Sequence, residues 1–208
     1  MWTLSLDATQ KELIAQLETS REAWQTTAAY DPERYQDPPA VRQKKGAALR
    51  KRVPHEAHAP WKPPRQRPSP VDIVVAGNTG RQEQLVPLRM ARMSASPFAF
   101  LRGAAAVMAW DLSHTPVSGA QVFIDGDAHI NNFGLYGTPQ RDVVIDVNDF
   151  DEATLGPWEW DLKRLVASVN VAGRDNGMSR RERRRAVLGA VRGRGDLSKW
   201  PRRGRRMY

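Results

Sequence analysis

Residues 121–161 constrain the fold most, because they hold nine carboxylates and a single Lys or Arg side chain, Arg141. Like charges at this density destabilise a folded chain unless a cation or hydrogen-bond donors offset the repulsion. The acidic groups gather in two stretches, GDAHINNFG at 126–134 and NDFDEA at 148–153. We therefore expect two acidic loops whose charge is offset by a cation or by hydrogen-bond donors.

A strand, a hairpin and a helix are predicted around these loops. QVFIDGD at 121–127 is typical of a strand that enters a loop, and NFGLYGTPQRDVVIDV at 132–147 predicts two strands around a turn at 137–141. A helix is predicted to begin near Pro157 and to end near Gly177. Because a tight hairpin brings its two ends together, the two acidic loops should be neighbours.

The rest of the chain divides by composition. Ser96 and Pro97 are a good N-cap and first residue for a buried helix over SPFAFLRGAAAVMAWDLSH. We expect an N-terminal helix within 1–30 (over 7–28), a Pro-rich basic extended arm at 31–70, a core at 71–191 and a basic disordered tail at 192–208.

The composition excludes several classes of protein. There are no cysteines, so disulfides, thiolate zinc sites and cysteine nucleophiles are excluded. The charged N-terminus argues against a secretory signal, and no apolar run approaches the roughly 18 residues of a membrane span. A cytoplasmic protein with no membrane partner is therefore expected.

The formal net charge of +9 comes from one end of the sequence. Residues 179–208 hold 12 Lys and Arg against 2 Asp and Glu, whereas residues 1–178 hold 20 against 21. One hypothesis, nucleic-acid binding through the basic end, would rest on electrostatics alone. It ranks last because the remaining chain is slightly acidic, so a nucleic-acid partner is not expected.

Two adjacent acidic loops suit Mg²⁺-assisted phosphoryl transfer. One carboxylate orients or deprotonates the attacking hydroxyl, while an Asn and a second carboxylate hold metal ions that bridge nucleotide phosphates. Mg²⁺ prefers such hard oxygen ligands. Turn capping by the same Asp and Asn side chains is the alternative interpretation.

The motif GD-x-H-x-x-N, followed by a hairpin and D-F-x-x-A-x-x-G-x-x-x-x-D-L, resembles the catalytic core of aminoglycoside phosphotransferases and choline kinases. The resemblance implies an α+β, protein-kinase-like fold with a hairpin between the acidic loops and flanking helices. It also implies Mg²⁺ and ATP as cofactors and an unknown hydroxyl acceptor. By the same resemblance Asp127 is the catalytic base, Asn132 and Asp149 are metal ligands, and Asp161 is a carboxylate that braces the loop.

A longer match, over about residues 45 to 190, is similar to an uncharacterised bacterial family catalogued as domain of unknown function 2252. It rests on R-M-x-x-SPFAFLRGAA, GDAHINNFGLYGTPQR and NDFDEATLGPWEWDLKRLVAS. Members of that family are typically longer than this chain. The resemblance therefore implies a C-terminal helical lobe that is incomplete here, and possible loss of activity.

Several side chains keep two interpretations. Arg102 is a candidate contact for nucleotide phosphate, or it pairs with a core carboxylate. His129 is expected to hydrogen-bond within its loop rather than to bind metal. Asp151, with its neighbour Glu152, either coordinates a second ion or is only solvated. AGNTGRQ at 76–82 lacks the pattern of a kinase phosphate loop. A non-catalytic, nucleotide- or partner-binding module is accordingly the alternative to a phosphotransferase.

Overall fold

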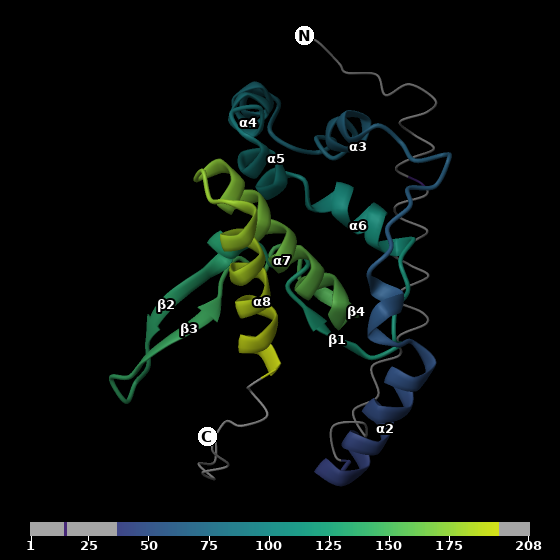
Figure 1. Cartoon of the computed structure of the whole chain (residues 1–208). Helices are drawn as coiled ribbons and strands as arrows, with labels where there is room; N and C mark the ends of the chain where they lie inside the picture. Colours follow the sequence, from purple (N-terminus) through teal and green to yellow (C-terminus); the bar gives the residue numbers. More distant parts are fainter. Residues whose placement is uncertain (1–14, 16–36, 196–208) are drawn as a thin grey trace.

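The computed structural model describes residue 15 and residues 37–195 (Figure 1). The helix predicted over 7–28 lies outside the described residues except at residue 15. Residues 196–208 of the predicted tail also lie outside them. The first four residues of that tail, 192–195, are the last residues of a helix.

The described residues form helices and two small antiparallel sheets, which confirms the α+β class. The elements follow the order α2 (Pro39–Arg52), η2 (His55–His58), α3 (Pro70–Ala76), η3 (Glu83–Leu85), α4 (Val86–Met93), α5 (Pro97–Gly103), α6 (Ala105–Ser113), β1 (Gln121–Ile124), η4 (Ile130–Asn132), β2 (Phe133–Gly137), β3 (Val143–Val147), β4 (Thr154–Pro157), α7 (Trp158–Asp175) and α8 (Arg180–Gly195). Among the described residues, no helix is long and apolar enough to cross a membrane.

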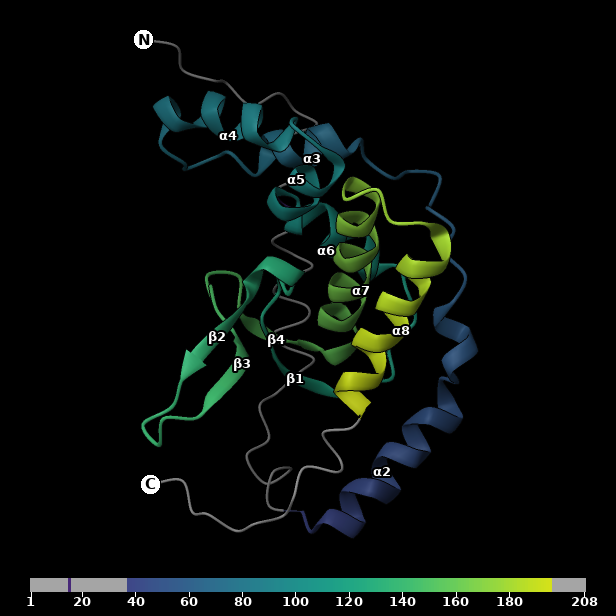
Figure 2. The same cartoon turned by 60° about the vertical axis from the view of Figure 1, so that its left-hand side comes forward.

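The predicted strand and hairpin are confirmed. β2 and β3 pair antiparallel, with Leu135 opposite Ile145, and the hairpin projects from the body of the molecule (Figures 1 and 2). Both side chains are more than 70% exposed, so this face of the hairpin is apolar and open. β1 pairs with β4, a strand that the sequence did not predict, with Ile124 opposite Thr154.

The single helix predicted over 96–114 is wrong, because the chain breaks at Ala104 into α5 and α6. The Ser96 cap is present: its side chain accepts a hydrogen bond from the backbone N–H of Ala99 at 3.1 Å. At the break, arginine side chains from other elements hydrogen-bond to the carbonyl oxygens of Leu101 and Gly103. These carbonyls would otherwise accept the next turn of helix bonds, so the helix ends.

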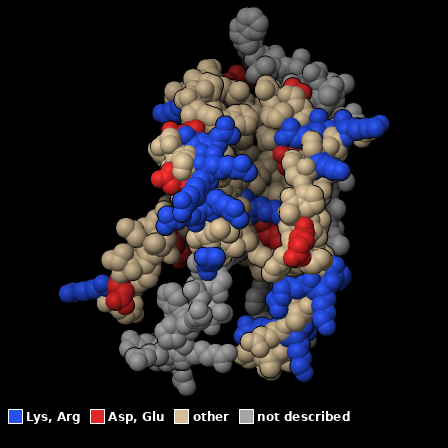
Figure 3. Space-filling view, viewed as in Figure 1, with Lys and Arg blue, Asp and Glu red and all other residues tan. Residues whose placement is uncertain are grey.

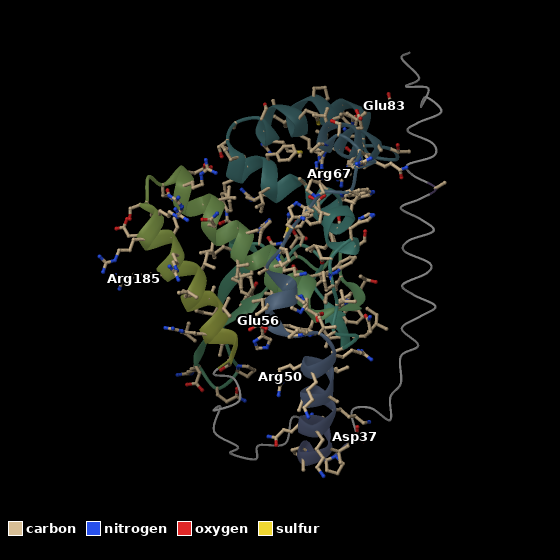
Figure 4. All side chains as sticks on the ribbon, turned by 45° about the vertical axis from the view of Figure 1, so that its right-hand side comes forward. Asp37, Arg50, Glu56, Arg67, Glu83 and Arg185 are labelled. Carbon is tan, nitrogen blue, oxygen red and sulfur yellow. The ribbon has the colours of Figure 1, made fainter. Side chains whose placement is uncertain are left out.

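The arm predicted as extended over 31–70 is helical in α2, over Pro39–Arg52. The prolines of that arm explain this, because Pro39 suits the first helical position and the following residues hold no further proline. The later Pro-rich part contains no α-helix before α3 and runs along the body. Arg67, which Figure 4 labels, lies in this part of the chain. It donates to both carboxylate oxygens of Asp111 on α6, at 2.6 and 2.8 Å.

The hydrophobic core lies among α3, α4, α5 and α6. Its buried residues are Ile73, Val74, Ala76, Met93, Ala104 and Val107. Helix α7 runs past this core, between it and the β1–β4 sheet, and α8 packs along α7 (Figures 1 and 2). The helix predicted from Pro157 to Gly177 is therefore the central element of the described structure.

Positive charge gathers at the surface of two helices. Figure 3 shows Lys and Arg over α8 and over α2. Arg185 on α8 extends away from the body (Figure 4). Both helices lie on the outside of the molecule, and α2 has no buried residue.

Gly126, at the start of the first acidic loop, lies so close to the second acidic loop that it tolerates no side chain. Its φ is 81°, and a Cβ there would lie 2.3 Å from the backbone oxygen of Glu152. Gly80 also has a positive φ, 78°, but a Cβ there meets nothing within 4 Å. Comparing substitutions at the two positions therefore separates the cost of backbone strain from the cost of disturbing the contact between the loops.

We expect Gly80→Ala to lower the free energy of unfolding by about 1 kcal/mol, the cost of a left-handed Ala. Gly126→Ala should lower it by on the order of 3 kcal/mol, because the Glu152 backbone must also move. Urea denaturation of both variants checks this. Equal losses in the two variants would mean that the loops do not need this close approach.

Candidate functional site

One cavity brings together five of the predicted site residues. Its volume is about 480 Å³, and it lies between the acidic loops and the helices α4 and α5. Its polar lining consists of Asp127, His129, Asn132, Asp149, Arg89, Arg92 and Arg102. Asp151 and Asp161 do not line it. Carboxylates therefore face arginines across one cavity.

Backbone and side-chain hydrogen bonds fix the Asp127 loop. The Asn132 side-chain amide donates to the backbone oxygen of Asp127 at 3.1 Å, and the Asn132 backbone N–H donates to His129 at 2.8 Å. The backbone N–H of Asn148 donates to the backbone oxygen of Asn132 at 2.8 Å. This last bond closes the base of the hairpin, so the two acidic loops are neighbours.

The loop is also held by one face of α7. Asp161, Arg164 and Ser168, at i, i+3 and i+7 of the helix, contact it at three points. The Asp161 carboxylate accepts from the backbone N–H groups of Asp125 and Gly126, at 2.9 and 3.1 Å. Asp161 thus occupies a bracing position rather than a place in the cavity.

Arg164 forms a buried ion pair with Asp127. Its Nε donates to Asp127 Oδ1 at 2.7 Å, its Nη2 donates to the same oxygen, and Nη2 also donates to the Leu101 carbonyl at 2.6 Å. Arg164 is only 2% exposed. The other oxygen, Asp127 Oδ2, lies 3.7 Å from His129 Nε2. Arg164 therefore occupies one side of the carboxylate and leaves Oδ2 toward His129 and the cavity.

Burial lowers the pKa of His129, and the nearby cations Arg164 and Arg102 act in the same direction against the opposing effect of Asp127. His129 is 4% exposed, and its Nδ1 has no hydrogen-bond partner among the described residues. Burial therefore favours the neutral imidazole. Its backbone oxygen accepts from Asn132, which places this residue within the loop hydrogen-bond network.

Asp149, in the second acidic loop, also lines the cavity, and its backbone is in the left-handed conformation, with φ at 65°. Its neighbours Asp151 and Glu152 are exposed and outside the cavity lining. Arg102 is exposed at the cavity wall and makes no ion pair with any residue that the structure describes. Asp127 pairs instead with Arg164.

The donor set fits Mg²⁺ bound together with a phosphate ligand. Within residues 37–195, no group of three or more His, Asp or Glu could hold a metal ion. The Asn132 amide uses its N–H on the Asp127 backbone, which leaves its oxygen as the available ligand atom. Mg²⁺ is commonly held by one or two protein oxygens, with water and substrate phosphates completing the shell. Asn132 and Asp149 could supply those two oxygens.

Sequence reasoning missed Arg164, Arg89 and Arg92. The signal for Arg164 was present, because D-x-x-R-x-x-x-S places three polar side chains on one face of the predicted helix. For Arg89 and Arg92 no motif marks the position. Their approach to the acidic loops depends on how α4 packs against α5.

Comparison with protein-family models matches residues 81–194 to the model described as "Uncharacterized protein conserved in bacteria (DUF2252)". The match covers more than half of the chain and includes every residue of the cavity. No curated protein and no solved structure matches the chain.

Breaking the Arg164–Asp127 pair should be costly, because it leaves a largely buried charge without a partner. We expect Arg164→Met to lower the free energy of unfolding by about 3–5 kcal/mol. Arg164→Met combined with Asp127→Asn should recover part of that loss, since no unpaired charge remains. A double-mutant cycle in urea measures the coupling. Additive losses would show that the two side chains do not depend on each other.

Asp125 should make stability fall as pH rises. Burial raises its pKa from 3.8 to about 6, and the Asp161, Asp127 and Asp149 carboxylates act in the same direction. Neither carboxylate oxygen of Asp125 accepts a hydrogen bond of ordinary geometry from the described residues. Between about pH 4 and pH 6 the folded state therefore keeps a proton that the unfolded chain releases.

The Asp125→Asn variant should accordingly be more stable than the wild type at pH 7, by on the order of 2 kcal/mol. Below about pH 4 the advantage should vanish, because the wild-type carboxyl is then protonated in both states. Urea denaturation of both proteins at pH 4, 5, 6 and 7 gives the difference at each pH, in which other carboxylates cancel. A difference that does not change with pH would contradict the assignment to Asp125.

Proposed function

The chain belongs to this family of uncharacterised bacterial proteins, and we propose that it is a Mg²⁺- and ATP-dependent phosphotransferase acting on a hydroxyl acceptor. The observation that carries the proposal is the meeting of Asp127, Asn132 and Asp149 in one cavity. These residues come from the two ends of one hairpin. A carboxylate with a free oxygen, an amide oxygen and a second carboxylate are the groups that phosphoryl transfer requires.

Each residue has a distinct role in the proposal. Asp127 orients the acceptor hydroxyl and takes its proton on Oδ2 as the acceptor oxygen bonds to the terminal phosphorus and the bond to the leaving phosphate oxygen breaks. Arg164 holds Oδ1, so the carboxylate cannot rotate away from the cavity. Asn132 and Asp149 would hold Mg²⁺, which when bound neutralises charge on the phosphates.

The order of elements supports a protein-kinase-like reading of this fold. A strand leads into the Asp127 loop, a hairpin separates it from Asp149, and β4 returns to pair with β1 before α7 begins. Helix α7 then supplies Asp161, which accepts two backbone hydrogen bonds at the start of the loop. This support lies in the arrangement of the described residues alone.

A second candidate is a module that binds nucleotide without turnover. The Arg164–Asp127 pair favours it, because a buried arginine that donates twice to one carboxylate oxygen is also what a purely structural carboxylate would have. In that case the cavity keeps its shape and its charges, and no proton transfer takes place.

Substitution of the two carboxylates separates binding from turnover. Asp149→Ala should remove Mg²⁺-dependent ATP binding in calorimetric titration, because a metal ligand is lost. Asp127→Asn also breaks the ion pair with Arg164, so its folding is checked first by circular dichroism; the folded variant should retain binding and reduce ATP turnover, with water or a screened alcohol as acceptor, by about 100-fold or more. Asp142→Asn is the matched control, since this exposed carboxylate lies at the far end of the hairpin.

Binding with no turnover by the wild type would favour the non-catalytic module. Turnover that survives Asp127→Asn would remove the assignment of the base. Equal effects of Asp142→Asn and Asp149→Ala would show that overall negative charge matters, rather than the geometry of the cavity.

A further inference from the structure

The wall of the cavity opposite the acidic loops is cationic. It contains Arg89 and Arg92 on α4, and Arg102 on α5. We propose that Arg92 and Arg102 bind the phosphate groups of the nucleotide, in place of a glycine-rich loop. This inference rests on the proposed function and assigns its phosphate-binding element.

The Arg89 side chain makes hydrogen bonds within the protein rather than facing a ligand. Its Nη1 donates to the Asn78 side-chain oxygen at 2.8 Å, and its Nη2 donates to the Gly103 carbonyl at 2.7 Å. These bonds attach α4 to the end of α5 and to the segment at 76–82. That glycine-containing segment contributes no residue to the cavity lining, and its Asn78 side chain accepts from Arg89 instead.

Arg92 and Arg102 are free for a ligand. Both are exposed, and neither side chain forms a hydrogen bond or an ion pair with any residue that the structure describes. Three guanidinium groups on one cavity wall repel one another unless an anion lies between them. The planar, permanently charged guanidinium suits bidentate contact with phosphate oxygens.

The packing of α4 on α5 brings the two arginines to the same cavity. A Cβ on Gly103 would lie 2.6 Å from Met93 Sδ, so the missing side chain allows the helices to approach closely. Arg92 precedes Met93 and Arg102 precedes Gly103, so each arginine is the neighbour of a residue in this contact. The wall is thus built by the fold.

The rest of the wall favours a nucleotide over free phosphate. Leu85 and Leu88 line the same cavity and are about half exposed, at 51% and 48%. Apolar surface beside guanidinium groups can cover a nucleobase while the arginines bind the phosphates. The opposing Asp127 and Asp149 carboxylates would meet those phosphates through Mg²⁺, which avoids direct repulsion.

Tripolyphosphate in the presence of EDTA tests the arginines without the metal site. The intact chain should bind it, and Arg92→Gln and Arg102→Gln should each weaken the affinity by roughly tenfold. The double variant should lose roughly 100-fold. Arg181→Gln is the matched control, because this exposed arginine lies on α8, outside the cavity. The affinity of that variant for tripolyphosphate should equal that of the intact chain.

A second set of variants guards against loss of folding. The double variant Arg92→Lys, Arg102→Lys keeps the positive charge and loses the planar, bidentate donor geometry of the guanidinium group. We therefore expect an affinity between that of the intact chain and that of the double Gln variant. Thermal melting should be unchanged, since both side chains are exposed. Tripolyphosphate should also displace ATP from the intact chain in a competition titration.

Four results would each overturn the inference. The intact chain does not bind tripolyphosphate, or Arg92→Gln and Arg102→Gln bind it as tightly as the intact chain does. The other two are that Arg181→Gln weakens binding as much as the cavity variants, or that ATP and tripolyphosphate bind at the same time. Asp149→Ala should leave metal-free tripolyphosphate binding intact. Failure of the arginine variants alone therefore removes this inference, whereas failure of the Asp127 and Asp149 variants alone removes the proposed chemistry.

Discussion

One face of α7 holds the acidic loop, and the site depends on that contact. Asp161 accepts two backbone hydrogen bonds at the beginning of the loop, Arg164 pairs with Asp127, and Ser168 accepts from Ile130 at 2.9 Å. Arg164 also donates to Leu101, which ties α5 to the same helix. The loop, the α5 end of the cationic wall and the central helix therefore form one hydrogen-bonded unit.

Local sequence signals predicted the part of the molecule that is built from local contacts. The hairpin over 132–147 and the helix from Pro157 follow from alternation, turn residues and helix boundaries, and each is present. The convergence of Asp127, Asn132 and Asp149 followed from the hairpin, because closing it brings its ends together. Ser96 was recognisable as a helix cap for the same local reason.

Interactions between distant segments account for what the sequence did not reveal. The break at Ala104 depends on arginines 63 residues later and 14 residues earlier than the carbonyls they contact. The pairing of β4 with β1 spans about thirty residues, and the α4 arginines reach the cavity through packing at Gly103. The helix at Pro39–Arg52 was hidden by the prolines around it, although its interior contains none.

The cationic wall has a consequence for the order in which ligands could enter this cavity. Arg92 and Arg102 bring positive charge to the cavity, and the Asp127 and Asp149 side chains lie in the same lining. A polyphosphate could therefore contact the arginines directly before any metal ion is present. A metal ion alone would meet too few ligands, because no group of three or more His, Asp or Glu among the described residues could hold it.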